Sequence, residues 1–375
     1  MTTARFIYDK SENNADLFYA TKFDAPDAYA YVEYRKKTYV LVSDLELDRA
    51  RGAAQVSHVI PLRTYREKLA KTKKDVVLVD LFHAFFAELG VRTIVVPPST
   101  PFSLVDALRK KKIRVESGGS PFFPARVQKT KQEWQTMINC QKAVFGAVKL
   151  TEETLRKSNI RGNRIWYRGA VLTSERLRSM VNVHLLEHGY MAKSPPIISS
   201  GVQACDPHED GTGPLLPNTS IIVDIFPQSL ATRFHGDATR TFCKGRASDA
   251  LKKLYATVLK GQELGIKMVK AGVHGNKIHN AIHALFEKEG YKTGEIKGRM
   301  QGFFHGTGHS IGLEIHEEPA RINASDYRLQ AGNVMSVEPG LYYPEIGGVR
   351  IEDLVYVTKT GCEVLGRYPK KLEIR

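Results

Sequence analysis

Four carboxylates occur in apolar, strand-forming segments of the C-terminal two thirds of the chain. Asp224 lies in SIIVDIF, Asp237 in GDATRTF, Glu338 in VMSVEPGLYY and Glu352 in GVRIEDLVYVT. An ionised carboxylate in apolar surroundings is unstable unless a cation or hydrogen-bond donors face it. We therefore expect these side chains to meet positive charge. Each one alone is also compatible with a turn or cap, and strand alternation would let Arg350 form an ion pair with Glu352.

Histidines gather between these carboxylate segments. The stretch FFHGTGHSIGLEIHEEP contains His305, His309 and His316. The first two have the spacing of the histidines in HExxH zinc helices, but the glycines around them disfavour a helix. We expect a glycine-rich strand or loop whose backbone approaches a metal ion or a substrate closely.

Four carboxylates and one imidazole form a hard, oxygen-rich ligand set. Such a set suits two divalent cations better than one, and manganese or cobalt better than a structural zinc ion, with zinc as the alternative. Two ions about 3.5–4 Å apart lower the pKa of a shared water toward about 7 and stabilise negative charge on a carbonyl oxygen. The predicted chemistry is metal-assisted hydrolysis.

The elements around these residues follow from the apolar periodicity. It predicts helices near residues 131–157, 174–189, 249–271 and 275–289. The carboxylate segments are predicted strands. Along GDATRTF, alternation places Asp237, Thr239 and Thr241 on one face.

The N-terminal third has an α/β pattern. Two β-rich runs around a polar turn predict a hairpin in residues 29–42. The following predictions are a buried strand at 75–80 (DVVLVD), a short helix ending at Gly90, a strand at 93–98 and a helix at 103–112. The stretch SGGSPFFPAR interrupts this pattern. We therefore place an α/β domain at residues 1–125 and a second domain at residues 126–375.

Composition excludes several classes of protein. The chain has 375 residues, 25% charged and 42% apolar, as folded proteins do. No run approaches the about 18–20 apolar residues of a membrane span, and the first residues lack the apolar core of a signal peptide, so we expect a cytoplasmic protein without a membrane partner. The four cysteines are isolated, which disfavours zinc knuckles and disulfides. The net charge of +15 is spread along the chain, so nucleic acid is not an expected partner.

These segments together resemble the pita-bread metallopeptidases, which include aminopeptidase P, prolidase, methionine aminopeptidase and the metal-free creatinase. The strings HGTGHSIGLEIHEEP, SVEPGLY and GVRIEDL are similar to the Xaa-Pro branch of that family. The N-terminal part is similar to the first domain of creatinase and prolidase relatives, with YATKF in place of tyrosine-leucine-threonine-glycine-phenylalanine. The resemblance implies an α+β fold in which a pita-bread catalytic domain follows a smaller α/β domain of the creatinase type.

The resemblance also implies a role for each metal ligand. Asp224 would hold one ion, Asp237 and Glu352 would bridge two ions, and His309 and Glu338 would hold the other. A metal-bridging hydroxide would attack the carbonyl carbon before proline, while Glu338 would shuttle the proton.

Further residues would contact the substrate, according to the same resemblance. The substrate-binding and catalytic set comprises His208, His305 and His316, and Arg350 is in the substrate-binding set. The segment between the two aspartates is longer than in the family, and its His235 has no implied role.

The expected activity is hydrolysis of the Xaa-Pro bond, either at the N-terminus of peptides, as in aminopeptidase P, or in dipeptides, as in prolidase. A prolyl peptide bond has no N–H, so a general protease loses a contact there. Relatives are commonly dimers, and we expect a homodimer. The alternatives are a methionine aminopeptidase, which lacks a folded N-terminal α/β domain, a creatinase, which lacks the metals, and a non-catalytic binding protein, which would have lost the ligands.

Overall fold

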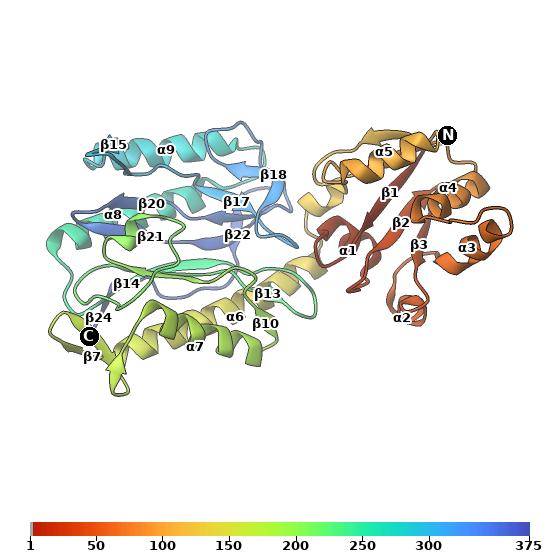
Figure 1. Ribbon diagram of the computed structural model, residues 1–375. Coiled ribbons are helices and arrows are strands. Elements are labelled where there is room, and N and C mark those ends of the chain that lie inside the picture. The colour runs from red at the N-terminus through yellow and green to blue at the C-terminus, as the bar shows by residue number, and fades with distance from the viewer. Residues whose placement is uncertain (1–2) are drawn as a thin grey trace. The chain divides into compact units, whose positions relative to one another are not determined.

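The computed structural model describes residues 3–375. The chain forms two compact units, which divide between Arg126 and Val127 (Figure 1). Each unit buries its own apolar core. Both combine helices with β-sheets, which confirms the predicted α+β class.

The first unit is built around a mixed sheet with the strand order β4-β3-β2-β1-β5-β6. The strands are β1 (Thr3–Asp9), β2 (Tyr29–Tyr34), β3 (Lys37–Val42), β4 (His58–Pro61), β5 (Thr93–Val96) and β6 (Arg114–Ser117). The helices are α1 (Ala15–Thr21), α2 (Leu47–Ala53), α3 (Leu62–Ala70), α4 (Leu78–Leu89) and α5 (Phe102–Lys110). The predicted hairpin is formed by β2 and β3, which pair antiparallel.

The predicted strand at residues 75–80 is wrong, because helix α4 begins inside this apolar run. Asp80 caps the helix start by accepting a hydrogen bond from a backbone N–H at 3.0 Å. Farther along, Phe82 and Phe86 lie one turn apart and pack edge-to-face on Phe6 of β1. A short apolar run does not distinguish a buried strand from a buried helix start, and here the helical period of the following phenylalanines decides.

The long helices of the second unit are α6 (Lys131–Arg156), α7 (Ser174–Glu187), α8 (Asp249–Met268) and α9 (Gly275–Lys288). Their ends agree with the predicted ranges to within three residues. α6 starts with a reciprocal cap, in which Thr130 Oγ1 accepts from the Glu133 N–H at 3.2 Å and the Glu133 carboxylate accepts from the Thr130 N–H at 2.9 Å.

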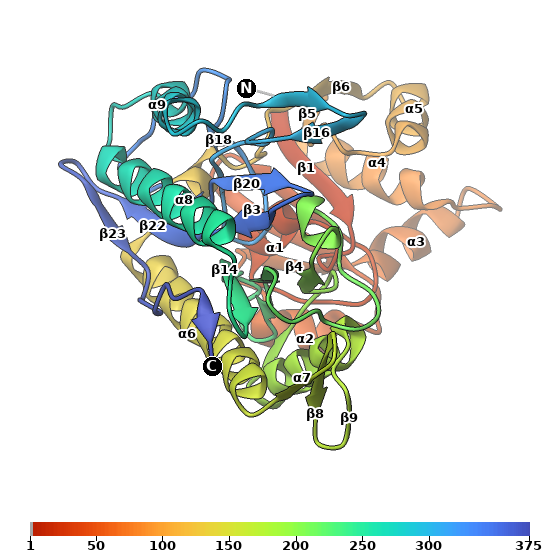
Figure 2. The ribbon, with the colours of Figure 1, turned by 90° about the vertical axis from the view of Figure 1, so that its left-hand side faces the viewer.

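The sheets of the second unit lie between these helices, with α6 and α7 on one side and α8 and α9 on the other (Figures 1 and 2). One sheet has the order β11-β12-β14-β24 and another the order β18-β17-β19-β22-β23. Their strands are β11 (Ile197–Ser200), β12 (Ile221–Ile225), β14 (Ala238–Lys244), β17 (Gly308–Ser310), β18 (Glu317–Ile322), β19 (Val334–Val337), β22 (Asp353–Val357), β23 (Cys362–Val364) and β24 (Glu373–Ile374).

Shorter strands complete this unit. They are β7 (Asn159–Arg161), β8 (Arg164–Tyr167), β9 (Ala170–Val171), β10 (Tyr190–Met191), β13 (Gln228–Ser229), β15 (Gly294–Ile296), β16 (Arg299–Gln301), β20 (Gly340–Tyr343) and β21 (Gly347–Arg350). Two short 3₁₀ turns among the described residues are η1 (Pro124–Val127) and η2 (Gln203–Cys205).

Two of the predicted strands are each broken at a carboxylate. VMSVEPGLYY forms β19 and β20 with Glu338 in the break, and GVRIEDLVYVT forms β21 and β22 with Glu352 in the break. β20 and β21 pair with each other, outside the sheet that contains β19 and β22. The expectation that Arg350 and Glu352 share one face of a continuous strand is therefore wrong. Because Glu338 and Glu352 lie outside the strands, their side chains need not follow the alternating orientation of strand residues.

Glycines on α8 allow this helix to pack closely on its neighbours. A Cβ atom at Gly261 would lie 2.6 Å from the ring of Phe286 on α9, and one at Gly265 would lie 2.9 Å from Val337 on β19. These distances are shorter than van der Waals contact, so a larger residue would push the helices or the sheet apart.

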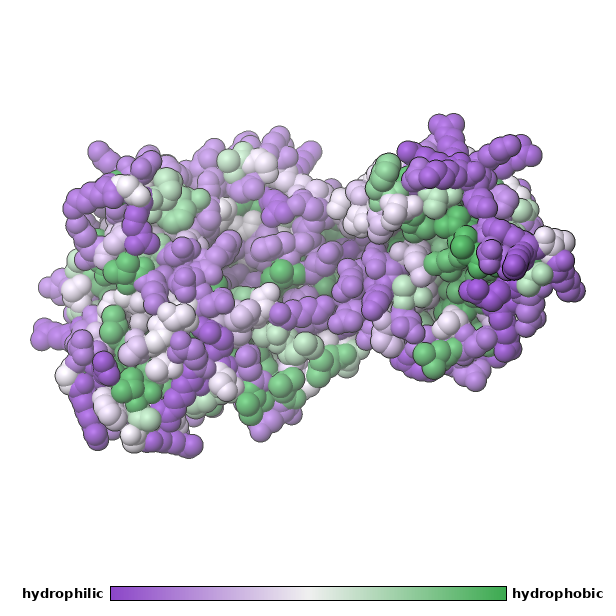
Figure 3. Space-filling model, viewed as in Figure 1, coloured by the Kyte–Doolittle hydropathy of each residue, from purple (hydrophilic) through white to green (hydrophobic). Residues whose placement is uncertain are grey.

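The face of the molecule drawn in Figure 3 is largely hydrophilic, with apolar side chains in small patches. Exposed apolar residues around α7, β10 and β13 include Val183, Leu186, Met191 and Leu230. Within residues 3–375, no helix is both long enough and apolar enough to cross a membrane.

We predict that Gly261→Ala destabilises the second unit by about 1–3 kcal/mol, because the methyl group overpacks against Phe286. This loss exceeds the gain of about 0.5–1 kcal/mol from helix propensity. The matched control is Gly52→Ala on α2, where nothing lies within 4 Å of the added Cβ. Differential scanning calorimetry should show a lower Tm for the first variant only. An equal Tm for the two variants would contradict the packing argument.

Candidate metal centre and substrate cavity

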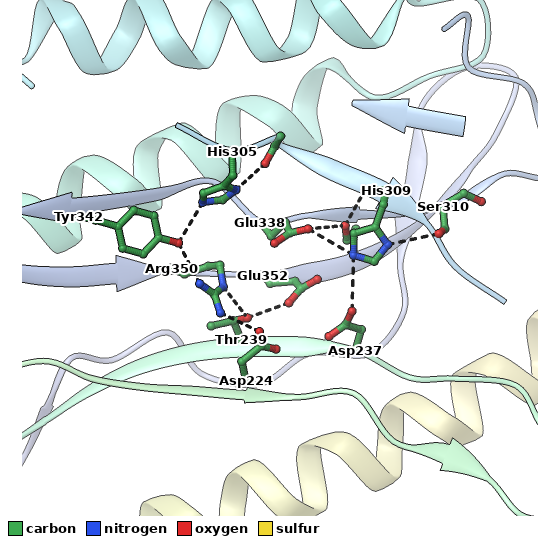
Figure 4. A network of polar contacts seen from close by, with 12 residues as sticks. Asp224, Asp237, Thr239, His305, His309, Ser310, Glu338, Tyr342, Arg350 and Glu352 are labelled. Carbon is green, nitrogen blue, oxygen red and sulfur yellow. Dashed lines mark hydrogen bonds and ion pairs between the residues drawn. The ribbon is translucent and has the colours of Figure 1, made fainter. Parts of the chain in front are cut away.

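The five predicted metal ligands come from five separate strands or strand ends and converge on one place (Figure 4). Asp224 lies in β12, and Asp237 directly precedes the neighbouring strand β14. His309 lies in β17, Glu338 follows β19, and Glu352 precedes β22. The two sheets thus face each other with carboxylates from both.

The side chains are close enough to share metal ions. His309 Nε2 lies 3.3 Å from Glu338 Oε1 and 3.7 Å from Asp237 Oδ2. One ligand atom each from Asp237, His309 and Glu352 lies within 4.8 Å of the others. Glycine makes this approach possible at β17, because a Cβ at Gly308 would lie 1.9 Å from a backbone oxygen of β19.

Three carboxylate oxygens at the centre have no hydrogen-bond partner among residues 3–375. They are Asp224 Oδ1, Asp237 Oδ1 and Glu352 Oε1, and all three residues are buried. Leaving buried acceptors unsatisfied is costly, and more so when they are charged. Divalent cations prefer such oxygen ligands. The donor set therefore fits divalent metal ions.

Burial and mutual repulsion shift the pKa values of this cluster. Burial, followed by the charge of Glu352, raises the pKa of Asp237 well above its usual value. Burial and the charge of Glu338 do the same for Glu352. Burial also opposes ionisation of Glu338, but the hydrogen bond and charge of His309 outweigh it and lower its pKa to about 2. Without cations, the cluster resists carrying its full negative charge.

A chain of hydrogen bonds connects Asp224 to His305. Arg350 donates from Nη2 to Asp224 Oδ2 at 2.8 Å and from Nη1 to the hydroxyl of Tyr342 at 2.9 Å. The same hydroxyl lies 2.9 Å from His305 Nε2, and His305 Nδ1 lies 2.7 Å from the carbonyl oxygen of Gly306. That carbonyl can only accept, so Nδ1 carries the hydrogen and Nε2 accepts from the tyrosine.

Burial keeps His305 and Tyr342, the titratable groups at the end of this hydrogen-bond chain, in one protonation state. It lowers the pKa of His305 to about 4 and raises the pKa of Tyr342 to about 12. Both side chains are therefore neutral near pH 7. Because both nitrogens of His305 are already hydrogen-bonded, this histidine presents the rest of its ring to its surroundings.

Other polar residues hold the ligands in place, and the sequence interpretation missed most of them. Thr239 Oγ1 donates to Glu352 Oε2 at 2.8 Å, and Gln141 Nε2 donates to the Asp237 carbonyl at 2.8 Å. Strand alternation had placed Thr239 beside Asp237, whereas nothing in the helical pattern distinguished Gln141. Tyr342 carried one signal, since a buried tyrosine hydroxyl normally needs a partner.

A second positioning group lies behind the ligands. Arg240 is buried and donates from Nη2 to Asp353 Oδ1 at 2.7 Å, and its Nη1 also bonds the Glu352 carbonyl oxygen at 2.5 Å. The guanidinium thereby ties β14 to the start of β22. This contact fixes the backbone of Glu352 and leaves its carboxylate unengaged by Arg240.

The ligands open into a cavity of about 730 Å³. The residues predicted to contact substrate all line it, namely His208, His305, His316 and Arg350. The ring of His316 lies 4.3 Å from that of His309, centroid to centroid, and burial lowers the pKa of His316 to about 4. Apolar walls are provided by Phe226 and Phe304. A cavity of this size accommodates a short peptide.

The long segment between Asp224 and Asp237 has a structural task. β13 in this segment pairs with β10, and the backbone N–H of His235 donates to the Gly312 carbonyl at 2.8 Å. His235 is buried, and burial lowers its pKa to about 4. The segment therefore contacts the loop between His309 and His316 at Gly312.

Comparison with known proteins gives consistent results. A model of metallopeptidase family M24 matches residues 137–359. The Xaa-Pro dipeptidase of Pyrococcus horikoshii is 32% identical over 176 residues, which are 47% of this chain and 48% of that protein. The chain thus matches about half the length of such curated relatives.

Similar solved structures cover almost the whole chain. An Xaa-Pro dipeptidase from Bacillus anthracis has a TM-score of 0.83 at 23% identity, over 99% of this chain and 95% of that one. An X-Pro aminopeptidase from Thermotoga maritima has a TM-score of 0.82 at 21% identity, over 99% and 97%. These similarities establish the same fold, and the family match confirms the predicted relation to the pita-bread metallopeptidases.

We predict that His309→Ala lowers the metal content, because the imidazole faces two of the proposed ligands directly. His316→Ala should leave metal content near normal, because the carboxylate oxygens without hydrogen-bond partners, which are the proposed metal ligands, belong to other residues. Elemental analysis of both variants after equilibration with manganese checks this. A His316→Ala protein that loses metal while His309→Ala keeps it would show that the wrong histidine was chosen.

Proposed function

Because the chain belongs to metallopeptidase family M24, we propose that it is a metallo-exopeptidase that hydrolyses Xaa-Pro bonds in proline-containing peptides. The observation that carries the proposal is the set of unsatisfied carboxylate oxygens of Asp224, Asp237 and Glu352 beside His309 and Glu338, at the base of a peptide-sized cavity. Similar proteins are named Xaa-Pro dipeptidase and X-Pro aminopeptidase, which supports this substrate class.

We propose that two divalent ions, manganese or cobalt with zinc as the alternative, bind these ligands. Asp224 would hold one ion, His309 and Glu338 would hold the other, and Asp237 and Glu352 would contribute to both. When bound, such ions acidify a water molecule and stabilise negative charge on the substrate's carbonyl oxygen. Side chains of the protein would transfer the proton and bind the substrate.

Glu338 is proposed to move the proton. Its carboxylate lines the cavity and can accept a proton from the attacking water. The proline nitrogen has no hydrogen in the peptide bond, so it must receive a proton before it leaves as a secondary amine. Glu338 faces the cavity, and we assign both the acceptance and the delivery of this proton to it.

The cavity histidines are proposed to bind the substrate. His208 and His316 line the cavity and can donate a hydrogen bond to a substrate carbonyl oxygen. His305 contributes the edge of its ring, since both of its nitrogens are engaged. Arg350 also lines the cavity, and its charge holds Asp224 in place.

Proline specificity follows from the missing N–H and the ring shape of the substrate. Phe226 and Phe304 offer apolar surface for a pyrrolidine ring. We predict that an Xaa-Pro substrate is cleaved at least about tenfold faster, in kcat/KM, than the matching Xaa-Ala substrate, since loss of apolar contacts and fit costs about 1–3 kcal/mol. Equal cleavage of both would remove the proline specificity from the proposal.

A dipeptide and a longer peptide separate the two proposed modes of action. The assay compares an Xaa-Pro dipeptide with an Xaa-Pro-Xaa peptide on manganese-loaded protein. Preference for the dipeptide assigns a prolidase, and preference for the longer peptide assigns an aminopeptidase P. Absence of cleavage of either peptide would contradict the proposed function.

We predict that Glu338→Gln lowers kcat by about 10² to 10⁴, the usual contribution of a positioned acid-base group. Glu363→Gln is the matched control, because Glu363 is exposed on β23 and should change kcat little. Metal content is measured on both variants to separate proton transfer from metal loss. Similar activities of the two variants would disprove the role of Glu338.

A further inference from the structure

A second pocket lies at the opposite end of strand β14 from Asp237. It has a volume of about 610 Å³ and shares no lining residue with the cavity described above. In Figure 1, β7, β24 and the C-terminal end of the chain lie beside one another at this place. Its cationic lining residues are Lys244, Arg246, Lys252 and Arg375, and its one carboxylate side chain is that of Glu373.

The charges in this pocket do not balance. Glu373 Oε1 lies 3.7 Å from Lys252 Nζ, so its negative charge is paired with that lysine. Lys244 and Arg246 have no ion-pair partner anywhere in the part of the chain that the structure describes. Two positively charged side chains therefore line the same pocket without an ion-pair partner among the described residues.

Lys244 is an unusual lysine because it is only 6% exposed. Its amine makes a single hydrogen bond, of 3.4 Å, to the carbonyl oxygen of Arg156 at the end of α6. Burial and the nearby positive charge of Arg156 lower the pKa of the amine. A buried ammonium that repels its neighbour is costly, and an anion between Lys244 and Arg246 would remove that cost.

Close packing and hydrogen bonds hold the backbone at Gly245 and Arg246, which line the pocket. Gly245 has a φ of +102°, and a Cβ there would lie 2.3 Å from Asn218 Oδ1 and 2.9 Å from Ile160. Asn218 Oδ1 accepts from the Arg246 N–H at 2.8 Å, and the Gly245 N–H donates to the Ile374 carbonyl at 3.0 Å. The absence of a side chain at Gly245 thus lets Asn218 and Ile160 pack against the backbone of this turn. The hydrogen bonds fix the backbone that carries Lys244 and Arg246.

The pocket also has an apolar wall. Ile160 on β7 lines it and is 38% exposed, so a ligand could cover its side chain. We propose that this pocket binds a small organic phosphate, with the phosphate group between Lys244 and Arg246 and the organic part against Ile160. A phosphate monoester carries a charge of about −1.5 to −2 at pH 7, which matches two unpaired cations. The volume is that of a small-molecule site.

Isothermal titration calorimetry on the manganese-loaded full chain tests this proposal. The probes are phenyl phosphate, inorganic phosphate and a single-stranded oligonucleotide, at constant chloride concentration. We expect saturable binding of phenyl phosphate, weaker binding of inorganic phosphate because it lacks the organic part, and no oligonucleotide binding that competes with phenyl phosphate.

Variants locate the binding. Lys244→Met and Arg246→Gln should each weaken phenyl phosphate binding by at least about tenfold, as expected for a charged hydrogen bond. Lys277→Met, which removes an exposed charge from α9, should leave it unchanged. If the buried Lys244→Met variant does not fold by circular dichroism, the exposed Arg246→Gln variant decides alone.

Three results would overturn the proposal. The first is no saturable binding of phenyl phosphate. The second is equal binding by the wild type and Arg246→Gln, which would place the ligand elsewhere, for example at the metal centre. The third is tighter binding of the oligonucleotide with a steep salt dependence, which would make this surface a nucleic-acid contact rather than a small-molecule site.

Discussion

The structure of the second unit depends on gathering carboxylates of like charge in a buried place. Asp224, Asp237 and Glu352 are buried, and each leaves an oxygen without a partner within the described residues 3–375. No single strand could present these groups, because alternation would send neighbouring side chains to opposite faces. Two facing sheets supply them instead, and two strands break at Glu338 and Glu352 so that their carboxylates reach the centre.

Hydrogen bonds around the cluster keep its geometry fixed. Arg350 and Thr239 bond carboxylate oxygens directly, whereas Arg240 and Gln141 bond the backbone of ligand residues. Arg350 and Thr239 each bond one oxygen of a carboxylate, that of Asp224 and that of Glu352, and the other oxygen of each carboxylate has no partner within residues 3–375. The carboxylate oxygens left without a partner are ligands of the kind that divalent cations prefer.

The site could be predicted from the sequence where a charged residue occurs in an apolar segment, as Asp224 does in its strand. The sequence also predicted the long helices, because their apolar period is sustained over several turns. It failed at residues 75–80, where a short apolar run fits a strand and a helix equally. It also failed at the breaks beside Glu338 and Glu352, since tertiary pairing of β20 with β21 decides them. Gln141 and Lys244 became apparent only when distant segments were seen together.

We propose that the buried carboxylates require divalent cations. Differential scanning calorimetry of metal-free protein, titrated with manganese, tests it directly, because ligands that bind only the folded state raise its stability. We expect the transition of the second unit to move to higher temperature with increasing manganese, while that of the first unit stays constant. A second-unit transition that does not respond to manganese, cobalt or zinc would show that the carboxylates do not bind these ions.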